Sequence, residues 1–383
     1  MSDSDMEFLR RAIRLAMNGR GRVEPNPMVG CVIVKDGKVI GEAHHGRFGG
    51  PHAEPTALEA CAPDCRGATA YVTLEPCCHT NKKTPPCAPR LVDAGIKRVV
   101  MGCLDPNPNV DGRGMTLLRN SGVEVVGPLM EAETKQLNAA FFKGTLFARP
   151  YVTLKWAESS NGKVAGAGGK RSQISNKRAM RVVHEMRARS DTILVGINTV
   201  LADDPQLTVR NVEIFRPLTR AVLDTNLRLP LESNLAHTGA SEVIIFCSRN
   251  TFRQSPRVAE LEGMGLKIIP MREASTGRLS LDDVLFDLDD RGQHLLIEPG
   301  PTLAQTFFEQ NLGDRVWVIR SPKPIDEATA PNAPLVPSHY VKTCDVNLDG
   351  DILTEYLNPK SPVFFAPEPS ADVVRLMGNG RAA

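Results

Sequence analysis

"PHAEPTALEACAPDCRGATAYVTLEPCCHTNKKTPPCAPRLVDAG" occupies residues 51–95 and combines an α/β folding pattern with several side chains that can bind a metal. A helix is predicted from about Glu54, a strand in "AYVTL" and a second helix in "APRLVDAG". Strands and helices that alternate along a chain predict a sheet with helices packed on both faces. His52 and Cys87 lie at the two predicted helix starts, which can therefore converge on one ion.

The same alternation extends on both sides of this stretch. Upstream, "FLRRAIRLAMNG" has apolar residues at helical spacing and ends at Gly19. "CVIVKDGKVIGEA" predicts a hairpin that turns at Asp36 and Gly37, because this dipeptide suits the positive φ angles of a tight turn. Downstream, "RVVMGC" and "VEVVG" predict strands around a helix in "GMTLLRNSG". The first part of the chain is therefore expected to be one α/β domain.

Length and pattern predict a second domain. A chain of 383 residues exceeds the usual size of a single core. A new strand, "YVTLKWA", follows Pro150, so the boundary is placed near Ala148, giving domains 1–147 and 148–383. The second domain alternates again, with strands such as "TILVGI" and "HLLIEPG" and helices such as "NKRAMRVVHEMRARS". The proline-rich segment beyond Pro322 is expected to be irregular.

Composition favours a cytoplasmic enzyme that acts on a small molecule. The formal net charge is +2, so no strong field attracts nucleic acid or an anionic membrane surface, and neither is expected as a partner. The sequence shows no secretory leader and no stretch of about 18 apolar residues. Nine cysteines, an odd number, favour thiols and metal ligands over a disulfide scaffold. Six are expected to be isolated small apolar residues: Cys31, Cys61, Cys65, Cys103, Cys247 and Cys344.

The remaining cysteines predict a catalytic zinc centre. Zinc prefers cysteine sulfur and histidine nitrogen, and a catalytic zinc keeps three protein ligands and an open position for water. His52, Cys77 and Cys87 supply such a set, and a helix start stabilises a thiolate at Cys87. "HAE" and "EPC" match the zinc deaminase signature, although the gap after the first cysteine is longer. Cys78 and His79 are alternative ligands at workable spacing.

Glu54 is the predicted acid and base of this centre. A bound zinc lowers the pKa of its water towards neutrality, and a glutamate two residues past the histidine can take the released proton. The predicted reaction is hydrolytic deamination, in which ammonia leaves an aromatic carbon. A structural zinc closed by four ligands, or no metal, is the alternative. A glutamate beside the histidine has no purpose in a closed site.

Several motifs together resemble the bifunctional deaminase/reductase family of riboflavin biosynthesis. They are "PNPMVGCVIV", "HAE", "LEPCCH", "KTPPC", "DPNPNVDGRG", "KWAESSNGKVA", "LADDPQLTVR" and "EPGPTL", in an order that covers residues 6–319. The resemblance implies an N-terminal domain of cytidine-deaminase fold with three layers, which removes ammonia from a phosphorylated pyrimidine. It implies a C-terminal domain resembling dihydrofolate reductase, which uses NADPH to open the ribose, and a homodimer.

The resemblance also implies roles for individual residues. His52, Cys77 and Cys87 become zinc ligands and Glu54 the proton carrier. The deaminase substrate pocket is formed by Asn26, His45, Lys83, Asp105 and Asn107. Both asparagines are followed by proline, so a simple turn residue is the alternative for each of them. The reductase substrate positions are Lys155, Arg187, Leu207, Arg210 and Glu298. The cofactor positions are Ala157, Thr199, Asp203, Thr225, Gly300, Pro301, Thr302, Leu303, Ala304, Gln305 and Thr306; Asp203 is also used around the sugar phosphate.

The sequence departs from the family pattern at four places. The two zinc cysteines are separated by one residue more than usual. Asn161 in "SSNGK" replaces an acid, Gln173 stands where an aromatic residue flanks the cofactor, and Pro299 in "EPGPT" removes a backbone donor. A second hypothesis follows from these changes: a deaminase that acts on another nucleotide or on tRNA, with a second domain that has no catalytic activity. The low net charge weighs against tRNA.

Overall fold

The computed structural model describes residues 3–80, 84–170, 172–237, 239 and 241–378. The chain divides into two compact units. The first runs to Phe147 and includes the short segment Ser370–Asp372, and the second comprises Ala148–Pro369 and the residues from Val373 onward. Among the described residues, no helix is both long enough and apolar enough to cross a bilayer.

The first unit is built on a five-stranded mixed sheet in the order β2-β1-β3-β4-β5. Its strands are β1 (Gly30–Lys35), β2 (Lys38–His44), β3 (Thr69–Leu74), β4 (Arg98–Cys103) and β5 (Glu124–Val126). β1 pairs antiparallel with β2 and β3, whereas β3, β4 and β5 are parallel. The predicted hairpin turn is confirmed, because Asp36 and Gly37 have φ angles of 51° and 74°.

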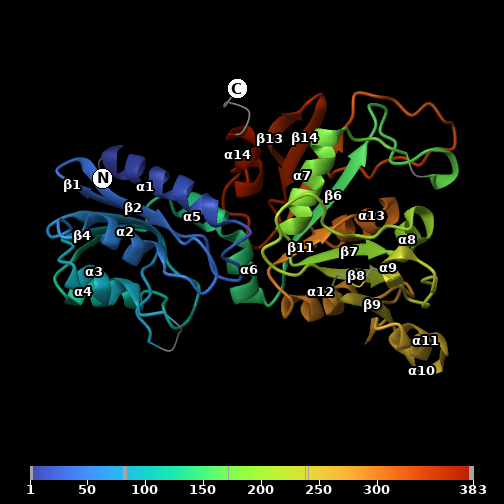
Figure 1. Ribbon diagram of the computed structural model, residues 1–383, viewed down its shortest axis with the longest axis horizontal. Coiled ribbons are helices and arrows are strands. Elements are labelled where there is room, and N and C mark those ends of the chain that lie inside the picture. The colour runs from blue at the N-terminus through green and yellow to red at the C-terminus, as the bar shows by residue number, and fades with distance from the viewer. Residues whose placement is uncertain (1–2, 81–83, 171, 238, 240, 379–383) are drawn as a thin grey trace. The chain divides into compact units, whose positions relative to one another are not determined.

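Helices cover both faces of this sheet (Figure 1). They are α1 (Asp3–Ala16) with the 3-10 turn η1 (Met17–Gly19), α2 (Ala53–Cys61), α3 (Cys87–Asp93), α4 (Arg113–Asn120), α5 (Glu131–Leu137) and α6 (Ala139–Phe147). Alternate residues of β1 face opposite sides, so Ile33 packs in a core with α2, α3 and α4, while Val32 packs with α1. The predicted three-layer arrangement is confirmed.

The second unit contains a nine-stranded sheet in the order β10-β9-β8-β7-β11-β6-β12-β14-β13. Its strands are β6 (Tyr151–Glu158), β7 (Thr192–Gly196), β8 (Thr219–Leu223), β9 (Val243–Ser248), β10 (Lys267–Met271), β11 (His294–Ile297), β12 (Arg315–Arg320), β13 (Val341–Leu348) and β14 (Asp351–Leu357). Neighbours from β10 to β12 are parallel, and β14 pairs antiparallel with β12 and β13.

Two apolar cores lie against the two faces of this sheet. The helical elements are η2 (Ala167–Gly169), α7 (Lys177–Ala188), α8 (Ile197–Asp203), α9 (Asn234–His237), α10 (Arg249–Gln254), α11 (Arg257–Gly263), α12 (Leu281–Asp289), α13 (Pro301–Glu309) and α14 (Ala371–Gly378). Val183 of α7 and Val200 of α8 belong to one core, and Leu285 of α12 and Phe307 of α13 belong to the other. The predicted α/β layering is therefore confirmed for this unit too.

The expectation of an irregular segment beyond Pro322 agrees with residues 323–340 but is wrong from Val341 onward, where the segment supplies two strands and a helix. "DILTEYL" in β14 alternates buried and half-buried residues along its whole length. Asp349 and Gly350, with φ angles of 57° and 105°, form the turn between β13 and β14. The same Asp-Gly dipeptide predicted the first hairpin. The second hairpin was not predicted, because the high proline content of the segment indicated irregular structure.

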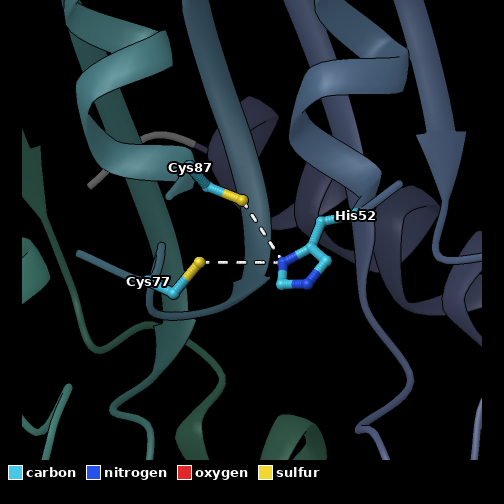
Figure 2. Close-up of side chains that lie close together, drawn as sticks. All are labelled: His52, Cys77 and Cys87. Carbon is cyan, nitrogen blue, oxygen red and sulfur yellow. Dashed lines mark hydrogen bonds between the residues drawn. The ribbon is translucent and has the colours of Figure 1, made fainter. Parts of the chain in front are cut away.

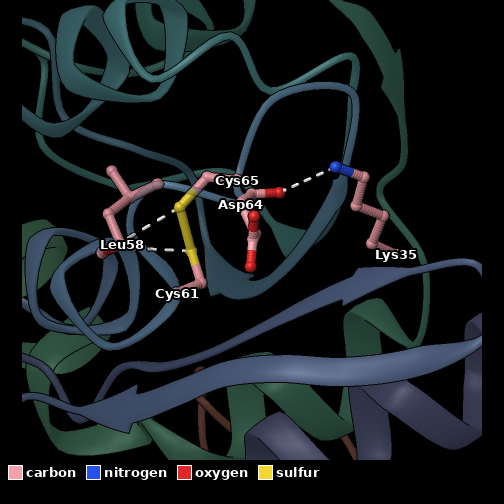
Figure 3. The surroundings of a disulfide bond; sticks show 5 residues. All are labelled: Lys35, Leu58, Cys61, Asp64 and Cys65. Atoms are coloured by element: carbon pink, nitrogen blue, oxygen red, sulfur yellow. Dashed lines mark hydrogen bonds between the residues drawn. A yellow bond between two sulfur atoms is a disulfide. The ribbon is translucent and has the colours of Figure 1, made fainter.

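The expectation that Cys61 and Cys65 are isolated is also wrong, because the structure joins them in a disulfide (Figure 3). α2 ends at Cys61, and the N–H of Asp64 then donates to the carbonyl of Cys61 at 2.8 Å in a turn. That turn brings the Cα atoms of the two cysteines to 5.6 Å, and both sulfurs lie 3.4 Å from the carbonyl oxygen of Leu58. Spacing alone did not reveal the turn that pairs them.

Candidate functional site

Three predicted metal ligands converge at one end of the first sheet (Figure 2). His52 is the N-cap of α2, Cys77 follows β3, and Cys87 is the first residue of α3. The Nδ1 atom of His52 lies 3.4 Å from the sulfur of Cys87 and 3.7 Å from the sulfur of Cys77. All three ligand atoms lie within 4.8 Å of one another.

The surroundings of these atoms fit a zinc ion with three protein ligands. One imidazole nitrogen and two thiols are the donors that zinc prefers. Cys87 is fully buried and Cys77 is 8% exposed, while the backbone N–H groups of Cys87 and Ala88 donate to the carbonyl of Cys77 at 3.0 and 3.1 Å. These bonds hold the two sulfurs together, and the start of α3 favours a thiolate at Cys87. Three ligands leave a fourth position available to water.

The alternative ligands Cys78 and His79 lie outside this group of donors in the described part of the chain. The thiol of Cys78 donates to the carbonyl of Asn109 at 3.9 Å and is partly exposed. The Nδ1 atom of His79 is buried and has no hydrogen-bond partner among the residues that the structure describes. The geometry therefore favours Cys77, and the assignment of the ligands stays a prediction.

Glu54 lies in the first turn of α2 and is only 3% exposed. Burial raises the pKa of its carboxyl group, and the thiolate charge of Cys77 raises the pKa further. Among the described residues, its Oε2 atom has no hydrogen-bond partner. A buried carboxyl group with a raised pKa, next to a set of metal donors, is suited to accept a proton and to release it again.

A cavity of about 360 Å³ lies in front of these residues. Its wall includes His52, Glu54 and Cys77, and it also includes four of the predicted substrate residues, which are Asn26, His45, Asp105 and Asn107. The fifth, Lys83, lies outside the described residues. The structure thus gathers residues from four separate stretches of sequence around one space, which is large enough for a small aromatic molecule.

His45 fixes the orientation of Asn26 in this wall. The Nδ1 atom of His45 lies 2.9 Å from the carbonyl oxygen of Pro51, which can only accept, so this nitrogen carries the proton. The Nε2 atom then accepts from the side-chain amide of Asn26 at 3.1 Å. Burial lowers the pKa of His45, which agrees with a neutral ring. The Oδ1 atom of Asn26 is therefore left as an acceptor for a substrate N–H.

Asp105 and Asn107 belong to a turn that borders the cavity. The carboxylate of Asp105 accepts from the backbone N–H of Asn107 at 2.9 Å, and the side chain of Asn107 accepts from the N–H of Asn109 at 3.0 Å. Asn107 is thus a turn residue and also a residue of the cavity wall. The two interpretations left open from the sequence are compatible.

Glu75 is a residue of this wall that the sequence analysis missed. It is 3% exposed, and its carboxylate accepts from the backbone N–H groups of Gly112 and Met115 at 2.9 Å each and of Asp105 at 3.4 Å. It therefore ties the Asp105 turn to the start of α4. Glu75 lies in the quoted motif "LEPCCH". An acidic residue directly after a buried strand is the sequence feature that could have identified it.

In the second unit, three of the predicted substrate residues form a polar cluster in which Lys155 is buried and Arg187 and Glu298 are half-buried. The carboxylate of Glu298 accepts two bonds of 2.8 Å from Arg187 of α7. Leu154 pairs with Ile297 between β6 and β11, so Lys155 and Glu298 follow as neighbours on adjacent parallel strands. Burial would raise the pKa of Glu298, but the charges of Arg187 and Lys155 outweigh it and lower the pKa to about 2.

The other two substrate positions, Leu207 and Arg210, lie in the segment between α8 and β8. Leu207 has a φ angle of 53°, and its side chain is 2% exposed within an apolar core. Only its main chain can therefore face a ligand. Arg210 is exposed and donates to the side chains of Gln206 and Thr208 at 3.0 and 3.5 Å. Its guanidinium group remains at the surface, where a phosphate can reach it.

The predicted cofactor residues gather in part at the start of α13. Gly300 is the N-cap, Pro301 occupies the first turn, and Thr199 of α8 lies opposite, since a Cβ on Gly300 would meet its hydroxyl oxygen at 3.9 Å. Such a helix start offers backbone N–H groups to a phosphate. Ala304 is fully buried in the core. Thr302, Leu303, Gln305 and Thr306 follow on the same helix. The other predicted cofactor positions lie on different elements: Ala157 in β6, Asp203 at the end of α8 and Thr225 just after β8.

Comparisons with known proteins match both units. Residues 2–103 match the family described as the cytidine and deoxycytidylate deaminase zinc-binding region, and residues 150–331 match the RibD C-terminal domain. The riboflavin biosynthesis protein RibD of Aquifex aeolicus is 37% identical over 324 residues, which are 84% of this chain and 88% of that protein. RibD of Escherichia coli is 39% identical over 83% of this chain and 88% of that protein. The chain belongs to the RibD family.

Solved structures of RibD proteins agree with this assignment. The Acinetobacter baumannii RibD structure has a TM-score of 0.76 and 34% identity, and it covers 92% of this chain and 98% of that one. A deaminase/reductase structure from Thermotoga maritima has a TM-score of 0.77 and 35% identity, covering 93% and 99%. The resemblance drawn from the motifs is confirmed: the chain is a bifunctional deaminase and reductase of riboflavin biosynthesis, with zinc and NADPH as its cofactors.

The departures from the RibD pattern in the second unit have different surroundings. The side chain of Asn161 accepts from the hydroxyl of Ser159 at 2.6 Å and donates to the carbonyl of Ile325 at 3.1 Å. A carboxylate in its place would have no proton to donate to that carbonyl. Gln173 is exposed, and Pro299 is buried directly before the N-cap of α13. Asn161 is thus accounted for by a local contact of this chain.

The stability of the second unit is expected to depend on Glu298 in acid. Because folding lowers the Glu298 pKa from 4.5 to about 2, the stabilisation is complete above about pH 5 and is lost as the pH falls to about 2. Both tryptophans, Trp156 and Trp317, lie in the second unit, so their fluorescence during urea unfolding reports on this unit. The difference in unfolding free energy between the wild type and Glu298→Gln should shrink through that window. A difference that does not change with pH would contradict the lowered pKa.

Proposed function

We propose that the chain catalyses two consecutive steps on one pathway intermediate. Residues 1–147 form the deaminase domain, which hydrolyses an amino group from a diaminopyrimidinone ribosyl phosphate. Residues 148–383 form the reductase domain, which converts the ribosyl group to a ribityl chain. The observation that carries the proposal is one cavity whose wall contains two of three clustered zinc donors, Glu54 and four side chains suited to a pyrimidine and its sugar.

In the deaminase, His52, Cys77 and Cys87 would hold the zinc. When bound, the zinc supplies a water whose pKa is near neutrality. Glu54 would accept a proton from the attacking water through its Oε2 atom, which has no partner among the described residues, and would deliver this proton to the leaving amine. A C–O bond would form to the ring carbon as its C–N bond breaks, and ammonia would depart. Asn26, oriented by His45, accepts from an N–H group of the pyrimidine and holds the reacting carbon in place.

In the reductase, the residues of the chain bind and orient the ribosyl group. NADPH supplies the hydride when bound. Glu298 directly follows the carboxyl end of β11, where ligands of α/β sheets bind, and Lys155 of β6 is its neighbour. These two side chains can hold the hydroxyl groups of the ribose. Arg210 is the cation proposed for the phosphate, because a guanidinium group can form two parallel bonds with its oxygens. The start of α13 at Gly300 is proposed for the cofactor phosphate.

A coupled assay on the purified full-length protein tests both halves. Zinc-loaded protein is mixed with the diaminopyrimidinone ribosyl phosphate and NADPH, and ammonia release and the loss of NADPH absorbance are followed together. We expect ammonia to appear first and NADPH to be consumed afterwards. Ammonia release with a constant NADPH signal would instead support the second hypothesis, in which the second domain is not catalytic. No ammonia would contradict the proposed substrate.

The proposal also includes the setting in which the enzyme works. We propose a homodimer in the cytoplasm, with small molecules and neither nucleic acid nor membrane as partners. The net charge of +2 supports the absence of a polynucleotide partner. Light scattering of the purified protein across a range of concentrations tests the dimer, and a mass equal to that of one chain would contradict it.

A further inference from the structure

His184 and Arg187 of α7 both contact the main chain of the segment that carries Arg210. They are three residues apart and therefore lie on the same face of the helix. The Nδ1 atom of His184 accepts from the backbone N–H of Arg210 at 3.3 Å, and Arg187 donates to the carbonyl of Thr208 at 3.1 Å. Arg187 is a predicted substrate residue, whereas His184 matches no motif in the sequence.

The segment they hold, residues 204–210, is neither helix nor strand and has little structure of its own to fix it. Asp204 and Leu207 have φ angles of 40° and 53°, in a backbone region that residues other than glycine rarely adopt. The buried Arg220 of β8 donates to the carbonyl of Gln206 at 3.2 Å. Asn234 of α9 donates to the carbonyl of Asp204 at 3.1 Å. The position of the segment therefore depends on side chains of α7, β8 and α9 that bind its main chain.

The bond from His184 acts at the residue whose position matters most. The N–H of Arg210 is attached to the residue whose side chain carries the guanidinium group, so holding this N–H holds the base of that side chain. The hydrogen bonds of the guanidinium group described above go to Gln206 and Thr208, which belong to the same segment. The bonds from Arg187, Arg220 and Asn234 act two, four and six residues earlier, at Thr208, Gln206 and Asp204. Without His184, binding a phosphate would also have to order this backbone, at a cost in affinity.

We propose that His184 is a positioning residue of the reductase: its Nδ1 atom holds the main chain at Arg210 and so sets where the Arg210 guanidinium meets the substrate phosphate. The proposal rests on the proposed reductase function. His184 is 7% exposed and is not expected to touch the substrate itself. It can accept the bond only while Nδ1 carries no proton. Burial, together with the charges of Arg187 and Arg210, lowers its pKa, which keeps the ring neutral at neutral pH.

Two substitutions test the role of the accepted bond. His184→Leu removes the acceptor, whereas His184→Asn keeps an oxygen near the position of Nδ1. For the reductase with deaminated substrate, we expect His184→Leu to raise KM for that substrate about five- to tenfold, as the loss of one hydrogen bond implies, with a smaller change in kcat. His184→Asn should restore most of the loss. KM for NADPH and the rate of ammonia release should stay at wild-type values in both variants, which shows that both domains are folded.

Arg210→Gln separates this inference from the proposed function. If Arg210→Gln raises KM for the deaminated substrate and His184→Leu does not, the positioning role is wrong and the phosphate role of Arg210 stands. If Arg210→Gln leaves this KM unchanged, the phosphate role itself fails and the positioning role fails with it. An equal rise of KM for the deaminated substrate in His184→Leu and His184→Asn would also overturn the inference, because the hydrogen bond that Nδ1 accepts would then not matter for binding.

A pH profile provides a readout that a purely structural role would not change, and it needs no variant that could fail to fold. The charged groups that act on His184 are Arg187, Arg210 and Glu298. As the pH falls below the ordinary histidine value of about 6.5, the ring gains a proton and can no longer accept from Arg210. We expect KM of the wild type to rise more steeply in acid than KM of His184→Asn, since the substrate phosphate titrates equally in both. Identical profiles would overturn the proposal.

Discussion

Glu54→Gln is expected to abolish ammonia release while the protein still binds zinc. The substitution keeps the size of the side chain but removes its ability to accept and deliver a proton, and general acid-base catalysis by one side chain contributes about 10²–10⁴-fold to a rate. Glu54 is buried, its pKa is raised by burial, and its Oε2 atom has no partner in the described part of the chain. Such an atom is available for proton transfer, so the loss should appear in kcat at full zinc occupancy.

The measurement combines an ammonia assay with metal analysis of the same samples. Glu59→Gln is the matched control, because Glu59 is an exposed glutamate on the same helix and should behave as the wild type. NADPH oxidation with deaminated substrate should be normal in both variants, since the reductase residues lie in the other unit. If Glu54→Gln loses zinc along with activity, Glu54 supports the metal centre and its assignment as the proton carrier is wrong.

The sequence allowed most of the fold to be predicted because its elements are locally regular. The hairpin at Asp36 and Gly37 and the alternation of strands with helices follow from turn chemistry and from hydrophobic spacing. The strands β13 and β14 were missed although Asp349 and Gly350 carry the same turn signal. The high proline content of that segment indicated irregular structure more strongly than its turn dipeptide indicated a hairpin. Proline content by itself does not exclude strands that lie between the prolines.

Side chains that act on the protein backbone were harder to predict than those that face a ligand. The metal donors and Glu54 have chemistry that spacing can reveal, because a zinc site requires particular atoms. Glu75 and His184 bind backbone N–H groups of segments distant in sequence, which are Gly112 in one case and Arg210 in the other. Any acceptor of suitable length can fill such a role, so no residue pattern identifies it. The partner is known only once the fold brings the two segments together.

Cys77→Ser and Cys78→Ser are expected to differ in zinc content and in deaminase activity, although the two cysteines are neighbours in the sequence. The sulfur of Cys77 lies 3.7 Å from the Nδ1 atom of His52, whereas the thiol of Cys78 contacts the carbonyl of Asn109. Cys77→Ser should therefore be isolated without stoichiometric zinc and without deaminase activity, since a neutral hydroxyl group is a poor replacement for a thiolate ligand. Cys78→Ser should keep the zinc content and the ammonia release of the wild type. The reductase should be active in both.

Thermal unfolding with and without a chelator distinguishes a lost ligand from a misfolded domain. A metal that binds only the folded state stabilises it, so chelation should lower the melting temperature of the wild type and of Cys78→Ser. Cys77→Ser, which has no metal to lose, should melt at the same temperature in both conditions. If only Cys78→Ser loses zinc, the ligand is Cys78 and not Cys77, and the backbone after β3 must follow a different course from the one described here. Zinc that survives both substitutions would mean that another donor, with His79 the nearest candidate in sequence, completes the centre.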